Sequence, residues 1–478
     1  MLAARKPGSM TPMDETIGTS RSRRAGVSRH HLVVEFAETA RLALPMALTQ
    51  LSQIAMMTTD LAFIGRLGGE AVAAAALAGT VYFVSFTFGM GLTSAVAPLV
   101  AQAFGAEDPT MVRRSLRTGL WAALLLSLPI MMFPLRGEQT LLLLGQTPQT
   151  ARLAQHYLFG LAWGVAPALW FLAIRSFMGA VNRPQPVLWI TLAAIPVNAL
   201  LVYLLMYGKF GLPRLELFGA GLATTLVNCA TFVAALWLAT RRKPFSDYRI
   251  LVRLWRIDWS LMRELFVIGL PMSLAFLMEY GMFSAASLLM GLIGTTALAA
   301  HQIALQVTAI LFMIPLGISM AATVRVGHAV GRDDAPGIRR AGLVAMLLGI
   351  AIALVLTLAV VATRFDIAEF FLGGTTDNAD ATTALAATLL LVGASFFVTD
   401  AMQGIAAGCL RGLKDTHLPL LFAGLGYWLI GFPLSWVLGF HTRLGATGVW
   451  VGLSIGTAVY ATLLVLRFRR LTRTGAVP

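Results

Sequence analysis

The sequence from Phe266 to Gly294 reads FVIGLPMSLAFLMEYGMFSAASLLMGLIG. This stretch is apolar almost throughout, and it is long enough for a helix to cross the hydrocarbon core of a bilayer. Its single charged side chain, Glu279, lies near the middle. A carboxylate at that depth costs about 3 kcal/mol on insertion scales, and such groups commonly mark ion or substrate pathways. The stretch therefore predicts a membrane-spanning helix with a carboxylate that titrates or binds a cation.

The composition of the whole chain agrees with this interpretation. Of the 478 residues, 58% are hydrophobic and only 12% are charged, whereas a soluble domain carries about 25% charged residues. The formal net charge is +14, but Lys and Arg are confined to the tails and a few loops. This distribution is typical of topology signals at a membrane surface and not of a nucleic-acid footprint. We therefore expect an all-α polytopic membrane protein that has no nucleic-acid partner.

Hydropathy predicts twelve spans, arranged as an N-lobe of six helices at 36–240 and a C-lobe of six helices at 264–468. A basic linker, 241–263, joins them. The remaining segments are a disordered basic tail at 1–35 and a short tail at 469–478. Arginine and lysine recur after every second span, so the positive-inside rule places both termini in the cytoplasm. We expect a multi-pass membrane protein.

The two predicted lobes repeat one another in sequence. Leu44-Pro45-Met46 recurs as Leu270-Pro271-Met272, an offset of 271 − 45 = 226. The same offset pairs further glycines and charged residues without a gap, ending with Arg113-Arg114 and Arg339-Arg340. Six spans per lobe is an even number, so both lobes enter the membrane in the same orientation. Substrate sites tend to lie between such parallel repeats.

Two further acids lie inside predicted spans, Asp60 in the first and Asp400 in the tenth. Asp60 pairs with Ala286 in the repeat, so the acids of the two lobes are not equivalent. If neighbouring helices bring Glu279 and Asp400 together, the pair can exchange protons or jointly ligate Na⁺. The alternative is structural: each carboxylate is neutralised by a hydrogen bond or by a buried arginine.

Other polar or aromatic side chains in the spans are candidates for lining a substrate cavity, although each alone is as well explained as a contact between helices. They are Gln53, Asn198, His301, Gln302, Gln306, Phe396 and Gln403.

No enzyme signature accompanies these residues. The sequence has no GxxxxGK[ST] nucleotide-binding loop, no HExxH and no paired CxxC motif. The two cysteines, Cys229 and Cys409, are far apart in apolar segments, and we expect two inert thiols. We therefore expect neither catalysis nor a cofactor nor an ATPase subunit, with energy supplied by an ion gradient.

Several motifs together resemble the multidrug and toxic compound extrusion (MATE) family, in its bacterial NorM-type branch. They are the duplicated LPM pattern, TTDLAFIGRLG at 58–68, VNRPQP at 181–186, GLPMSLAFLMEYG at 269–281, TALAAHQIALQ at 296–306, VRVGHAVG at 324–331 and FFVTDAMQGIAAGCLRGLKD at 396–415. The resemblance covers residues 36–468. It implies two six-helix bundles in a V around a central cavity. It also implies cation binding at Glu279 and Asp400, and an N-lobe site at Asp60 with Asn198 nearby.

The resemblance leads us to expect a multidrug efflux antiporter of the bacterial inner membrane, acting as a monomer on small-molecule drugs and dyes in exchange for Na⁺ or H⁺. The sequence leaves the choice of ion open. A lipid-linked precursor flippase of similar architecture is the alternative, but an anionic lipid would need a basic cavity, whereas the deep charges singled out here are acidic. A receptor or membrane enzyme lacks any supporting motif.

Overall fold

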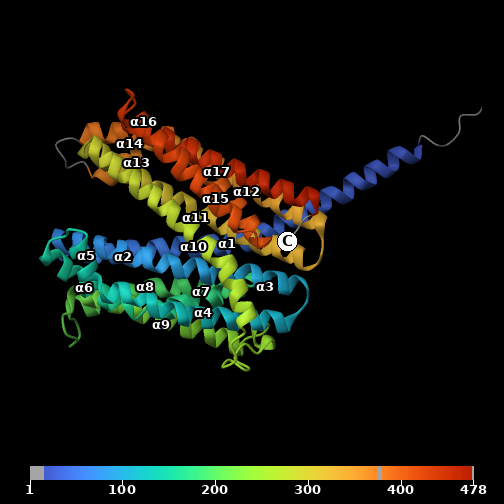
Figure 1. Ribbon diagram of the computed structural model, residues 1–478, viewed down its shortest axis with the longest axis horizontal. Helices are drawn as coiled ribbons and strands as arrows, with labels where there is room; N and C mark the ends of the chain where they lie inside the picture. Colours follow the sequence, from blue (N-terminus) through green and yellow to red (C-terminus); the bar gives the residue numbers. More distant parts are fainter. Residues whose placement is uncertain (1–14, 374–378, 476–478) are drawn as a thin grey trace, which may run out of the picture.

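The computed structural model describes residues 15–373 and 379–475, with side chains described from residue 30 onward. Over these ranges the chain is helical without a β-strand, and the helices form two elongated lobes that lie against each other (Figure 1). The N-lobe consists of α1 (Glu15–Gly65), α2 (Gly69–Ser94), α3 (Val96–Gly105), α4 (Pro109–Leu135), α5 (Gly137–Leu143), α6 (Pro148–Ala162), α7 (Val165–Ala180), α8 (Gln185–Tyr207) and α9 (Glu216–Arg241). The C-lobe consists of α10 (Trp259–Ile293), α11 (Thr295–Gly331), α12 (Ala335–Ala362), α13 (Arg364–Leu372), α14 (Ala379–Gly412), α15 (His417–Ala423), η2 (Gly424–Gly431), α16 (Phe432–Phe440) and α17 (Ala446–Thr474).

The spans agree with the predicted all-α membrane fold. Within the described ranges, ten helical segments are long and apolar enough to cross a bilayer, and the bent pair α6–α7 makes eleven. That pair bends by 47° just before Pro167, which cannot donate a backbone hydrogen bond. The remaining predicted span is the first, which lies in α1; this helix is long enough but carries Gln50, Gln53 and Asp60. It packs along α8 and α11 inside the bundle.

The sequence repeat is visible in how the helices begin. Asp108 caps α4 by accepting a hydrogen bond from the amide of Met111, and Asp334 caps α12 by accepting one from Gly337, both at 3.0 Å. The two caps are separated by the repeat offset, 334 − 108 = 226. An Asp side chain at this position satisfies an amide that has no partner within the helix. The repeat therefore preserves the helix starts.

The same offset relates two close backbone contacts between the lobes. Gly91 of α2 lies against Ser273 of α10, and Gly317 of α11 lies against Ala47 of α1. A Cβ atom on Gly91 would lie 2.3 Å from the Ser273 hydroxyl oxygen, and one on Gly317 would lie 2.5 Å from the Ala47 nitrogen. Only glycine permits backbones to approach this closely. Each contact is the repeat mate of the other, so the two lobes are related by a pseudo-two-fold axis.

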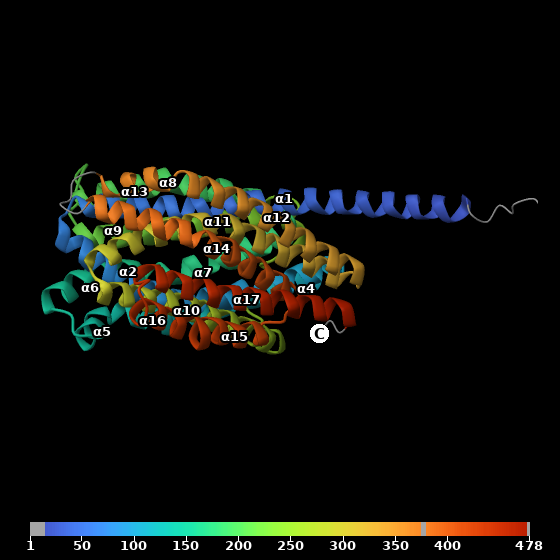
Figure 2. The ribbon, with the colours of Figure 1, turned by 90° about the horizontal axis from the view of Figure 1, so that it is seen from above.

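One end of the bundle carries a concentration of arginines. We call it the basic end and define it as the end at which α4, α10 and α12 begin, on the right in Figures 1 and 2. The linker between the lobes lies there and contains η1 (Phe245–Tyr248). It covers 242–258, which is shorter than predicted, because α10 already begins at Trp259 with Asp258 as its cap.

The start of the N-lobe differs from the predicted boundary. Residues 15–35 are helical and belong to α1, where the sequence predicts a disordered tail, and this part extends away from the bundle (Figure 2). No proline lies between Glu15 and Pro45, so a helix anchored in the bundle continues outward. The rest of the predicted tail, 1–14, lies outside the described residues.

Candidate functional site

A cavity of about 520 Å³ lies between the lobes. Side chains of α1, α2 and α7 line it from the N-lobe, and side chains of α10, α11 and α14 line it from the C-lobe. Its wall is mainly apolar and rich in aromatic and methionine side chains, including Phe83, Phe276, Phe283 and Met313. Methionine is adaptable and aromatic faces attract cations. The wall therefore suits lipophilic ligands of varied shape, including cationic ones.

A pair of carboxylates opens onto this cavity. Glu279 of α10 and Asp400 of α14 both line it, and the amide nitrogen of Gln403 connects them. Gln403 Nε2 donates to Glu279 Oε1 at 3.2 Å and to Asp400 Oδ1 at 3.1 Å. Asp400 and Gln403 are three residues apart and therefore share one face of α14. The structure thus brings together the two acids that the sequence singles out in the C-lobe.

Two arginines line the same cavity. Arg175 of α7 donates a hydrogen bond to Gln50 Oε1 at 2.9 Å, and the Arg411 guanidinium lies 5.3 Å from the ring centre of Phe276. Because Lys and Arg were predicted only in the tails and a few loops, neither Arg175 nor Arg411 was expected at the cavity. An arginine inside the apolar run WFLAIRSFMGA was the signal that was missed. The statement that the deep charges are acidic is therefore wrong, because the cavity also holds two guanidinium groups.

The predicted lining residues separate into two groups. Gln302, Gln306 and Gln403 line the cavity, whereas Gln53, Asn198, His301 and Phe396 are absent from its wall. The His301 ring nitrogens are bonded to Ser287 and Trp450, and Phe396 packs edge-on against Trp450. His301 and Phe396 are therefore part of the C-lobe core.

Asp60 lies in a separate place within the N-lobe. It accepts a hydrogen bond from the amide nitrogen of Asn198, which is fully buried on α8, and neither residue lines the cavity between the lobes. The two predicted N-lobe residues are therefore partners. Among the described residues no three His, Cys, Asp or Glu side chains cluster as a metal site, so a cation at Glu279 and Asp400 needs further oxygen ligands from amides, backbone or water.

At the basic end the lobes touch through polar contacts. The strongest is a bidentate ion pair in which Arg325 of α11 donates to Glu35 of α1, with distances of 2.8 and 2.9 Å. His328 bonds the carbonyl of Ala180, and Gln102 donates to the carbonyl of Gly412. The sequence analysis placed Glu35 in the tail. Its partner is 290 residues away, so no local pattern pointed to the contact.

Known proteins were compared with the chain in sequence and in structure. The MatE family profile matches residues 45–204 and 271–437, two segments whose starts are separated by the repeat offset. A "Probable multidrug resistance protein NorM" from Bradyrhizobium diazoefficiens is 65% identical over 97% of this chain and 99% of its own length. A protein of the same name from Rhodopseudomonas palustris is 60% identical over 92% of each chain.

The fold of this chain is similar to that of several solved structures. A structure titled "Crystal structure of MATE in complex with MaL6" superposes with a TM-score of 0.85 at 20% identity, covering 92% of this chain and 97% of that one. The eukaryotic MATE transporter AtDTX14 gives 0.81 at 22% identity, covering 93% and 98%. At these identities the likeness concerns the fold alone. The extent of the profile match and the identity to the two NorM proteins establish that the chain belongs to the MatE family.

Proposed function

We propose that this protein is a secondary antiporter of the bacterial inner membrane that exports lipophilic, often cationic drugs in exchange for Na⁺ or H⁺. The observation that carries the proposal is the carboxylate pair Glu279 and Asp400, joined by Gln403, on the wall of an apolar cavity between two lobes. The names of the NorM relatives support the class of substrate. The protein is a transporter and not an enzyme, and it acts alone.

The exchange follows from electrostatics. With both carboxylates ionised, the site attracts a cationic drug whose apolar part contacts the aromatic wall. A proton, or Na⁺ bound between the two carboxylates, cancels part of their negative charge and lowers the affinity of the site for the drug. Gln403 suits either ion, since its amide donates N–H groups to bare carboxylates and presents an oxygen to a hard cation when it rotates.

The electrical gradient across the membrane supplies enough free energy to export a solute against its concentration ratio. One charge that enters down 100 mV yields about 2.3 kcal/mol. At about 1.4 kcal/mol for each tenfold ratio, this sustains roughly a 50-fold concentration ratio of a neutral solute.

The arginines of the basic end support a cytoplasmic location for that end and for both termini by the positive-inside rule. The lobes touch there through Glu35 and Arg325, so the conformation described is closed on the cytoplasmic side. It corresponds to the state in which an outside cation replaces the drug. Reloading from the cytoplasm then requires the lobes to separate at the basic end.

Transport of a fluorescent cationic dye into inverted membrane vesicles tests the proposal. Na⁺ and pH gradients are imposed separately, and the gradient that drives uptake identifies the coupling ion. We expect Glu279→Gln and Asp400→Asn to abolish driven uptake while the protein remains in the membrane. Asp380→Asn is the matched control, because Asp380 is exposed at the start of the same helix as Asp400. Normal uptake by both cavity variants would disprove the coupling role.

The lipid flippase is not favoured by any contact in the cavity. The cavity wall contains as many carboxylates as arginines, and Arg175 and Arg411 each have a partner, Gln50 or Phe276. An anionic pyrophosphate head group would meet no net positive charge there.

A further inference from the structure

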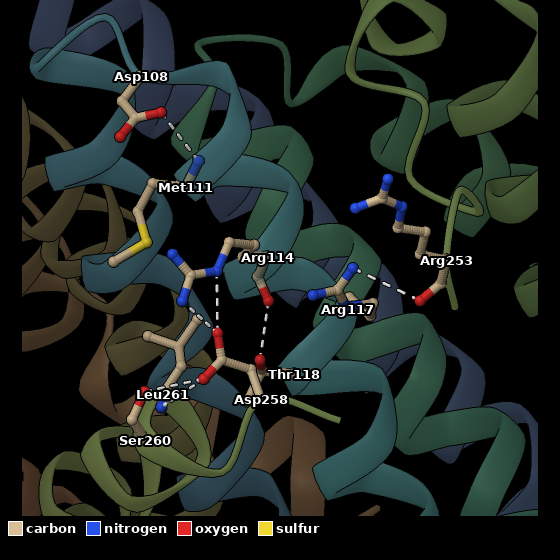
Figure 3. Close-up of polar contacts among 9 residues, drawn as sticks. All are labelled: Asp108, Met111, Arg114, Arg117, Thr118, Arg253, Asp258, Ser260 and Leu261. Atoms are coloured by element: carbon tan, nitrogen blue, oxygen red, sulfur yellow. Dashed lines mark hydrogen bonds and ion pairs between the residues drawn. The ribbon is translucent and has the colours of Figure 1, made fainter. Parts of the chain in front are cut away.

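A second pocket, of about 400 Å³, lies at the basic end, apart from the cavity between the lobes. Helix α4 of the N-lobe forms one wall, and the end of the linker with the start of α10 forms the other (Figure 3). Six charged side chains line it: Arg113, Arg114, Arg117, Arg253, Arg256 and Asp258. The proposed antiport makes no use of this pocket.

The charges in this pocket do not balance. Asp258 accepts a hydrogen bond from Arg114 Nε at 2.9 Å and a second, shorter one from Nη2 (Figure 3). Across the part of the chain that the structure describes, no carboxylate forms an ion pair with any of the other four arginines. Four guanidinium groups therefore share one pocket without an ion-pair partner, and a bound anion would relieve their repulsion.

Arg117 is the buried member of the group. It is only 6% exposed, although its side chain extends across the pocket toward Arg253 (Figure 3). Its Nη1 lies 3.5 Å from the backbone carbonyl oxygen of Arg253, while its Nε has no hydrogen-bond partner, and neither does the buried Nε of Arg113. Unused donors on a buried cation are costly, and a ligand that brings several acceptor oxygens would satisfy them.

The residues beside the pocket indicate where such a ligand comes from. Leu251, Val252, Trp255 and Trp259 are 44%, 43%, 78% and 67% exposed, respectively. They alternate with arginines along the linker. Exposed tryptophan next to arginine is typical of the boundary between membrane and water. The mouth of the pocket therefore lies at the level of the lipid head groups.

From this arrangement we infer that the pocket binds a phosphate group, held between the arginines of α4 and those of the linker. Arginine suits this ligand because its planar fork matches phosphate oxygens two at a time. An anionic phospholipid head group and soluble phosphate share this chemistry, and the exposed tryptophans favour the lipid. Since α4 belongs to the N-lobe and the linker leads into the C-lobe, a bound phosphate ties the lobes together at the basic end.

Calorimetric titration of the full-length protein in a neutral detergent tests this inference. The titrants are short-chain phosphatidylglycerol, short-chain phosphatidylcholine and inorganic phosphate. We expect saturable binding of phosphatidylglycerol that weakens at least tenfold in Arg253→Gln/Arg256→Gln. Both of these arginines are exposed, so the fold is retained, and elution as a single species verifies it. Arg113→Gln/Arg117→Gln probes the opposite wall.

The matched control is Arg469→Gln/Arg470→Gln, which removes the same charge from exposed positions near the end of α17. Phosphatidylglycerol binding that depends on the pocket, without binding of inorganic phosphate, supports a lipid ligand. Binding of inorganic phosphate with the same dependence supports the phosphate site and assigns it a soluble ligand. The inference is overturned if the pocket variants bind phosphatidylglycerol as tightly as the control does, or if phosphatidylcholine binds equally well.

Discussion

The ion pair between Glu35 and Arg325 makes a specific prediction about the conformational equilibrium. The two side chains are 11% and 13% exposed, respectively, and the contact is bidentate. Replacement of Glu35 by Gln leaves the guanidinium largely buried without a counter-charge. Breaking a fully buried pair in this way costs about 3 to 5 kcal/mol. For a pair that keeps slight access to water we expect about 2 to 3 kcal/mol.

This cost in free energy applies only to the conformation in which the lobes touch at the basic end. The pair joins α1 to α11 only while the lobes touch at the basic end, so its loss destabilises that state relative to the separated one. At about 1.4 kcal/mol for each factor of ten, the equilibrium shifts by about 30- to 140-fold toward separation. A state that is rare in the wild-type protein then becomes readily detectable.

The assay is a distance measurement by pulsed electron resonance. Spin labels are attached at Arg183→Cys in the N-lobe and Arg339→Cys in the C-lobe, both exposed positions near the basic end, after Cys229 and Cys409 are replaced by Ala. We expect Glu35→Gln to add a population with a longer distance. The double variant with Arg325→Gln should recover part of the wild-type distribution, because it removes the unpaired charge.

Glu38→Gln is the matched control on the same helix, since Glu38 is half-buried and forms no ion pair among the described residues. An unchanged distance distribution in Glu35→Gln would refute the argument. So would an equal shift in Glu38→Gln, since the effect would then come from any loss of charge on α1.

Three further predictions concern single contacts. Gln403→Leu should lower the Na⁺ affinity of the carboxylate pair about tenfold or more, since it removes the amide oxygen that a hard cation can use as a ligand, and Na⁺-driven dye transport measures this. At the linker, burial opposes ionisation of Asp258, but hydrogen bonds from Arg114, Ser260 and the backbone outweigh it and lower the pKa of Asp258 from 3.8 to about 2. The stabilisation is therefore complete above about pH 4 and is lost as pH falls toward 2. Asp258→Asn keeps a capping side chain but should lose about 1 kcal/mol, and its thermal unfolding should vary less over that pH range. Asn198→Leu should destabilise the protein by about 1 to 3 kcal/mol, because Asp60 loses its hydrogen-bond donor, and a fall in the midpoint of thermal unfolding checks this.

Sequence reasoning succeeded where the signal was local or periodic. The spans follow from hydropathy, and the repeat follows from an ungapped register that the structure reproduces in the caps of α4 and α12. The sequence singled out Glu279 and Asp400, which the structure places together on the cavity wall, because a carboxylate is costly at membrane depth whatever its neighbours are.

Sequence reasoning failed to identify which polar residues line the cavity, because this depends on how each helix is rotated about its axis. Gln306 faces the cavity, whereas His301, five residues earlier on α11, is buried in the C-lobe core. Hydropathy does not distinguish these faces, because the helices are apolar all round and lack a polar stripe. The contact of Glu35 was inaccessible for a different reason: it is fixed only when the lobes close.

If the protein works by the proposed exchange, the four charged side chains of the cavity disfavour joint binding of the drug and the coupling ion. With both carboxylates ionised, Glu279 and Asp400 offset Arg175 and Arg411, so the empty cavity is formally neutral. One bound cation makes it positive, and a second at about 5 Å is then opposed by about 3 kcal/mol at an effective dielectric constant of 20. That is a factor of more than 100 against double occupancy. In the proposed exchange, the arginines that sequence reasoning overlooked would make the drug and the coupling ion exclude each other, because without them the two carboxylates would accommodate both cations at once.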